Sequence, residues 1–241
     1  MSIEELWLPM LVIFIGAYVQ TAIGFGLAII AAPVLIILDP QWVPLPIIIS
    51  AFTVALLGAV RHRRSIKIGQ LKMALLGRVP GSLLGAGLLV WVSSSVLSMW
   101  VGVLVLVAVL VSLMPIRYEP TPRRMAVAGF FSGLFGTSSA IGGPPMALLL
   151  QHQEAHSLRA NLSAFFIASS LISIAVLVVL GHVTWSHIYM SVPLIPATMA
   201  GFFLAIKTTE HLPKQTVRYS ALLLCSVSGS VAIYESLFVM K

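Results

Sequence analysis

Residues 136–145 read Gly-Thr-Ser-Ser-Ala-Ile-Gly-Gly-Pro-Pro and interrupt an apolar stretch that extends from residue 124 to residue 151. The two flanking segments are each too short to cross a bilayer, because a spanning helix needs about 20 apolar residues. Gly24-Phe25-Gly26 interrupts the first apolar stretch, residues 6–38, in a similar way. These interruptions predict two pairs of short, broken helices, and the rest of the fold is built around them.

The whole chain has the composition of a membrane protein. Of its 241 residues, 59% are hydrophobic and 9% are charged, whereas a typical soluble domain has about 45–50% apolar and about 25% charged residues. So few charged groups cannot cover a soluble globule, which excludes a soluble enzyme, a disordered protein and a nucleic-acid-binding module. The single cysteine, Cys225, excludes a disulfide framework and a Cys-rich metal site. We expect no cofactor and no metal.

Six further segments are long enough to span a bilayer as helices. They occupy residues 43–60, 71–92, 97–115, 160–180, 186–206 and 216–238. Residues 1–116 then contain the short pair 6–38 and three full spans, and residues 117–241 contain the short pair 124–151 and three full spans. The sequence therefore predicts an all-α integral membrane protein, a polytopic helical bundle of two repeats in one compact domain.

The basic residues predict that the two repeats are inserted in opposite orientations. Arg61, Arg63, Arg64 and Lys67 follow the first full span of one repeat, whereas the matching loop of the other, residues 181–185, has no Lys or Arg. Cytoplasmic loops are enriched in Lys and Arg. All basic loops are cytoplasmic together only if the repeats are inverted and both termini are extracytoplasmic; the alternative is chance placement of charge. Inverted repeats with interrupted helices are typical of secondary transporters, whose substrate site lies at the interruptions.

The interruptions are the predicted site. The returning half-helices begin near Gly24 and Gly142, and we expect their N-termini to face a shared central zone. Helix N-termini carry unpaired N–H groups and partial positive charge, which favour an anion. The candidate residues are Gln20, Thr21, Gly24, Phe25, Gly26, Thr137, Ser138, Ser139, Gly142 and Gly143. The alternative is that the glycines and serines only permit close helix packing, and that Phe25 packs rather than lines or gates the site.

Arg78 is the only basic residue clearly inside a predicted span. Its planar guanidinium suits a bidentate pair with an oxyanion, but a long side chain at this depth also suits snorkelling to the interface. Both interpretations stay open from sequence. No span carries a central carboxylate, so we do not expect a buried Asp/Glu proton relay. An inside-negative membrane potential then drives anions outward, which favours export.

Two motifs carry a resemblance to a known family. Residues 16–26, Gly-Ala-Tyr-Val-Gln-Thr-Ala-Ile-Gly-Phe-Gly, followed by Pro33, resemble the first motif of the sulfite exporter TauE/SafE family. Residues 129–136, Gly-Phe-Phe-Ser-Gly-Leu-Phe-Gly, with Gly142-Gly143-Pro144-Pro145, resemble its second. The resemblance covers nearly the whole chain. It implies a multi-pass permease of the plasma (inner) membrane for sulfite, sulfoacetate or related organosulfonates. The family's second motif is often richer in glycine than residues 137–139, which leaves the anion open.

The predicted function is thus the export of a small sulfur-containing anion by alternating access, with that anion and the lipid bilayer as partners and a homodimer left open. The alternatives are a passive anion channel and an importer of a different small anion on the same scaffold. An intramembrane serine protease built on Ser138 is disfavoured, because every histidine is predicted near an interface while Ser138 is predicted near the midplane. We therefore do not expect an enzyme.

Overall fold

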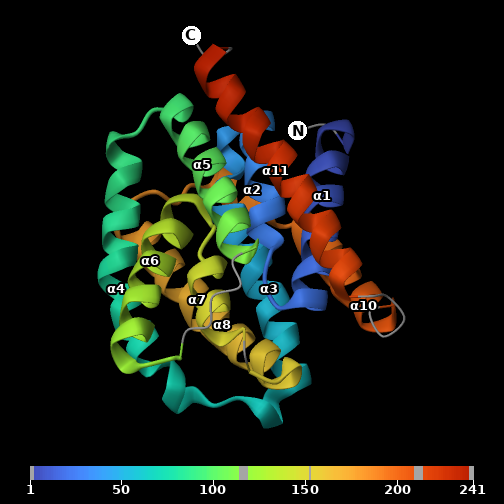
Figure 1. Ribbon diagram of the computed structural model, residues 1–241. Helices are drawn as coiled ribbons and strands as arrows, with labels where there is room; N and C mark the ends of the chain where they lie inside the picture. The colour runs from blue at the N-terminus through green and yellow to red at the C-terminus, as the bar shows by residue number, and fades with distance from the viewer. Residues whose placement is uncertain (1–2, 114–118, 152, 209–213, 239–241) are drawn as a thin grey trace.

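The computed structural model describes residues 3–113, 119–151, 153–208 and 214–238. The regular structure in these ranges is helical (Figure 1). The helices are α1 (Ile3–Ile23), α2 (Leu27–Leu38), α3 (Leu45–His62), α4 (Ile68–Trp91), α5 (Ser94–Leu113), α6 (Pro122–Ser139), α7 (Gly143–Leu150), α8 (Ala155–Val179), α9 (Trp185–Ser191), α10 (Leu194–Thr208) and α11 (Lys214–Phe238), with short 3-10 turns at Pro40–Trp42 and Arg63–Ser65. The predicted all-α membrane fold is confirmed.

Seven helical segments of the described residues are long and apolar enough to cross a bilayer. Six correspond to the predicted full spans, and the seventh is α1. Helix α1 has 21 residues and a length of about 31 Å at 1.5 Å per residue. It is therefore longer than the prediction, which was a short helix beginning at residue 6. Helices α2 and α7 have 12 and 8 residues and are too short to span. The predicted span 186–206 is divided into α9 and α10 near Pro193, which has no backbone N–H to donate.

The two interrupted pairs approach the middle of the molecule from opposite ends. In Figure 1, α1 runs inward from the end where α11 finishes, and α2 turns back toward that end. Helix α6 enters from the other end, and α7 returns toward it. The proposed boundary between the repeats, residues 116–117, and the chain termini, residues 1–2 and 239–241, lie outside the described residues. The inversion of the repeats stays a prediction.

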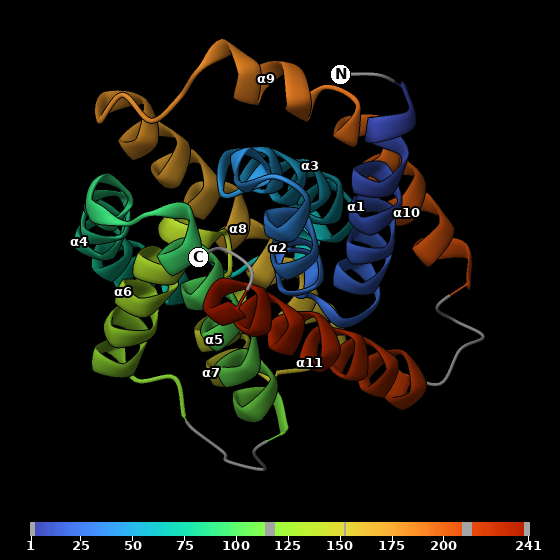
Figure 2. The ribbon, with the colours of Figure 1, turned by 90° about the horizontal axis from the view of Figure 1, so that it is seen from above.

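The main helix contacts join the two halves of the chain. Helix α4 packs along α6, α1 along α10, α3 on α8, and α5 on α11. Figure 2, seen from above, shows the α4–α6 pair on one side of the bundle and the α1–α10 pair on the other, with α2 and α3 between them. The first helix of each interrupted pair, α1 or α6, therefore packs along a helix of the opposite half.

Glycines bring α4 and α6 into backbone contact. A Cβ atom on Gly81 would overlap the carbonyl oxygen of Phe130, and a Cβ atom on Gly129 would overlap that of Ala74. Small residues allow this close approach between membrane helices. Glycine packing thus explains part of the second motif, and it also presses the middle of α4 against the second interruption.

Candidate functional site: a central cavity at the two interruptions

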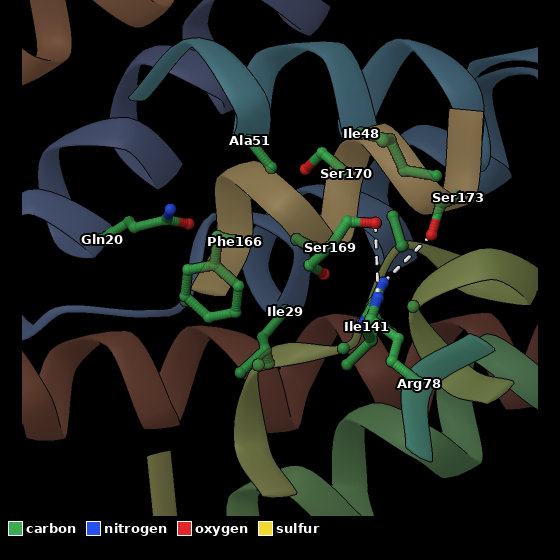
Figure 3. A pocket seen from close by; sticks show the side chains of 16 residues that line it. Gln20, Ile29, Ile48, Ala51, Arg78, Ile141, Phe166, Ser169, Ser170 and Ser173 are labelled. Atoms are coloured by element: carbon green, nitrogen blue, oxygen red, sulfur yellow. Dashed lines mark hydrogen bonds between the residues drawn. The ribbon is translucent and has the colours of Figure 1, made fainter. Parts of the chain in front are cut away.

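A cavity of about 40 Å³ lies between the two interruptions. Figure 3 shows the side chains around it, which come from α1, α2, α3, α4, α6 and α8 and from the break before α7. Five of the predicted site residues line it: Gln20, Gly26, Arg78, Gly142 and Gly143. The structure therefore brings together residues that are more than 100 positions apart in the sequence, at the depth where both helix pairs break.

The first interruption presents free backbone amides. Gly24 and Gly26 have backbone φ angles of 106° and 126°. Residues other than glycine rarely adopt such angles, and they turn the chain sharply before α2. The buried Gln20 accepts a hydrogen bond at Oε1 from the Leu27 N–H over 3.3 Å. The next two residues, Ala28 and Ile29, line the cavity, and their N–H groups begin the helix without an intrahelical acceptor. The start of α2 is therefore suited to an anion.

The second interruption offers fewer amides than the sequence analysis expected. Ala140 has φ of 65° and reverses the chain, and α7 begins at Gly143 after Gly142. Pro144 and Pro145 follow directly, and proline has no N–H. The α7 terminus thus lacks most of the donors that a helix N-terminus normally presents. The start of α7 is therefore a poorer anion site than its glycines alone would suggest.

Arg78 supplies positive charge beside this donor-poor terminus. Its side chain is 2% exposed, so it does not snorkel to a surface. Nη1 donates to Ser132 Oγ over 2.7 Å, Nη2 donates to Ser173 Oγ over 3.0 Å, and Nε donates to the Ser169 carbonyl over 3.3 Å. The guanidinium carbon also lies 5.7 Å from the centre of the Phe165 ring. These partners are all uncharged, and no carboxylate pairs with Arg78 in the described part of the chain.

The serine partners tie Arg78 to the second interruption. Ser132 Oγ accepts a hydrogen bond from Arg78 and donates one to the Gly142 carbonyl. This hydroxyl therefore links the guanidinium to the backbone of the second interruption. Ser173 Oγ lies 2.7 Å from Thr137 Oγ1, which places Thr137 behind the cavity wall rather than in it. The guanidinium is therefore held from two sides, by α6 and by α8.

The remaining predicted residues lie away from the cavity. Thr21 donates to the Ala17 carbonyl over 2.7 Å, and Ser138 accepts from Trp100 Nε1 over 3.1 Å. Ser139 donates to the Phe135 carbonyl and accepts from the Ile141 N–H. Gly24 packs near Leu162, and Phe25 lines two neighbouring cavities instead. These residues shape the interruptions without facing the central space.

The sequence analysis missed Ser169, Ser170 and Ser173, which line the cavity from α8, and Ser132, which holds Arg78. The signal was present, because Ser169 and Ser173 are four residues apart in an apolar span and therefore lie on one helix face. Hydroxyls inside a membrane helix usually form bonds between helices. Glycine content alone did not point to these serines.

The cavity is electropositive and carries no metal-binding group. A buried charge is costly unless it is paired, and the cation of Arg78 has only neutral dipoles around it. Within the described ranges, no cluster of three or more His, Cys, Asp or Glu residues could hold a metal ion. The arrangement can thus bind a small anion between the α2 N-terminus and Arg78.

Comparison with protein families identifies the family of the chain. Residues 9–231 match the family model described as Sulfite exporter TauE/SafE. Comparison with curated proteins and with solved structures gives no match. The match covers nearly the whole chain, and its helices are those of a multi-pass membrane protein. The chain belongs to the sulfite exporter TauE/SafE family, a family of membrane transporters and not of enzymes.

Proposed function

We propose that the protein exports a small sulfur-containing anion, such as sulfite or an organosulfonate, across the cell (inner) membrane. The anion binds in the central cavity, between the free amides of Ala28 and Ile29 and the guanidinium of Arg78. The observation that carries the proposal is the buried Arg78, which has three neutral partners and no carboxylate. A bound anion supplies the missing negative charge.

The size of the cavity favours a compact anion. About 10–15 Å³ of such space is enough for one water molecule, so the 40 Å³ cavity accommodates only a few water-sized groups. Sulfite fits this limit better than a longer organosulfonate, which would need the helices to move apart. The lining is also suited to an oxyanion, since Arg78, the serines of α8 and the first residues of α2 all border the cavity.

The mechanism we propose is alternating access between two inverted repeats, residues 1–116 and 117–241. It is supported by the opposite directions from which the two interrupted pairs reach the cavity (Figure 1) and by the pairing of α4 with α6 and of α1 with α10. If the repeats rock against each other, the central anion is exposed alternately at the two ends. A buried carboxylate for proton coupling is absent from the described spans, so the membrane potential drives the anion outward.

Flux measurements in proteoliposomes test this function. Arg78→Gln should reduce sulfite efflux at least tenfold, because an uncharged amide cannot neutralise the anion, and Arg78→Lys should retain part of the rate. Lys72→Gln is the matched control, since Lys72 is on the same helix but is exposed. Normal efflux by Arg78→Gln would contradict the proposal. Unitary currents in a planar bilayer would instead favour the passive channel.

A further inference from the structure

A second group of positive side chains lies at one end of the molecule, apart from the central cavity. Arg61, His62, Arg63, Arg64 and His156 line an open cavity of about 670 Å³; we call this group the basic vestibule. It is built from the end of α3, the 3-10 turn that follows and the start of α8. The rings of His62 and His156 lie 5.7 Å apart, so the two segments meet directly.

The charges of the vestibule are not compensated by protein groups. Arg61, Arg63 and Arg64 are exposed, and no acidic side chain of the described residues forms an ion pair with them. Glu154, the N-cap residue of α8 two positions before His156, is also exposed and is not paired with them. Several cations around one concave space repel each other, so the space attracts anions. Basic side chains in the last turn of α3 also suit the negative end of the helix dipole, but this does not account for Arg63, Arg64 or His156.

A further arginine connects the vestibule to the first interruption. Arg159 is one helical turn beyond His156 and, together with Arg61, interacts electrostatically with His62. Its Nη2 donates to the Ala22 carbonyl over 2.7 Å, and its Cγ lies 3.8 Å from the position of a Cβ atom on Gly24. Positive charge therefore extends from the open cavity to the first interruption, where Gly26 lines the central cavity.

We propose that the basic vestibule is a second binding site, for the same class of small oxyanion, which loads the central cavity. This inference rests on the proposed function and adds a site to it. A cleft lined by charge of one sign raises the local concentration of a counter-ion, and with it the association rate, by about 10- to 1000-fold. Salt screens the effect over a Debye length of about 8–10 Å. The continuity through Arg159 favours a free anion over a lipid headgroup as the occupant.

The first test is sulfite flux in proteoliposomes of phosphatidylcholine alone. The double variant R63Q/R64Q should raise the half-saturating sulfite concentration about tenfold at low salt and leave the maximal rate unchanged, and the difference should shrink at high salt. R63K/R64K should restore the wild-type value. The control K72Q/R123Q removes two exposed charges from the beginnings of α4 and α6, which lie at the same end (Figure 1) but outside the vestibule; it should behave as wild type.

Lipid composition and direct binding complete the test. If R63Q/R64Q is impaired only when phosphatidylglycerol is present, the vestibule binds lipid headgroups and the inference is wrong. Calorimetric titration with sodium sulfite should show two components, of which Arg78→Gln removes the central one and R63Q/R64Q the outer one. If R63Q/R64Q still shows both binding components, the vestibule inference is wrong and the proposed function stands. If Arg78→Gln still shows both components, the proposed function is wrong, so the two failures are distinguishable.

Discussion

Arg78 on α4 donates a hydrogen bond to Ser132 on α6, with 2.7 Å between Nη1 and Oγ. Ser132 in turn donates to the carbonyl of Gly142, so one hydroxyl connects the buried cation to the backbone of the second interruption. This interruption carries Pro144 and Pro145 where amides would otherwise be free. A side-chain cation from the other half thus provides the positive charge that the α7 terminus lacks, and the site is asymmetric in its donors.

The hydroxyl of Ser132 should matter for anion binding. Ser132→Ala leaves Nη1 without its partner and frees the guanidinium to turn, and a hydrogen bond to a charged group contributes about 1.5–3 kcal/mol. We expect sulfite affinity, measured by calorimetry, to fall about tenfold or more. Ser138→Ala is the control, because Ser138 bonds with Trp100 away from the cavity. Equal losses in the two variants would argue against a specific role for Ser132.

Space beside Gly136 should be required for the position of Arg78. A Cβ atom on Gly136 would lie 2.8 Å from Arg78 Nη2, so Gly136→Ala pushes the guanidinium out of its place. We expect sulfite efflux to fall severalfold. Gly87→Ala has no neighbouring atom within 4 Å and should keep full efflux, with a gain in stability of about 0.5–1 kcal/mol from better helix propensity. Normal efflux by Gly136→Ala would show that this contact is not needed.

A negative charge at Gln20 should prevent anion binding while it preserves the fold. Gln20→Glu keeps an oxygen that accepts from the Leu27 N–H, and a carboxylate is favourable at a helix N-terminus. In the cavity wall, however, it repels the substrate and pairs electrostatically with Arg78. We expect an unchanged or higher melting temperature and at least tenfold weaker sulfite binding. Thr21→Val is the control, because the Thr21 hydroxyl donates to the Ala17 carbonyl away from the cavity; this variant should bind sulfite as wild type does. Tight binding by Gln20→Glu would exclude Gln20 from the site.

Close packing of α4 on α6 should be needed for stability. Gly81→Ala places a methyl group where the Phe130 carbonyl lies, and overpacking of this kind costs about 1–3 kcal/mol. We expect a lower melting temperature in detergent and, since Arg78 is carried by α4, weaker sulfite binding. Gly69→Ala, at the start of the same helix, meets nothing within 4 Å and should melt as wild type. A stable Gly81→Ala variant would contradict the tight helix pair.

Most of the helical architecture was predictable from local sequence. Apolar runs, glycines and prolines act over a few residues, because in a membrane each helix must satisfy its own backbone hydrogen bonds. The interruption at Gly24-Phe25-Gly26 lies where it was predicted. The second interruption is shorter than the predicted range 136–145, because α6 continues to Ser139 and α7 begins at Gly143. Helix ends were less certain: α1 gains length from its polar first turn, and Pro193 divides a run that is uniformly apolar.

The sequence by itself determined that the chain crosses a membrane, where its helices break, and that a lone arginine lies within a span. Only the tertiary structure decided which side chains surround that arginine. Ser132 and Ser173 are 54 and 95 residues away from Arg78, and they meet it because glycines let α4 approach α6 closely and α8 packs beside them. Such lateral contacts depend on the rotation and spacing of whole helices, which hydropathy and local motifs do not specify.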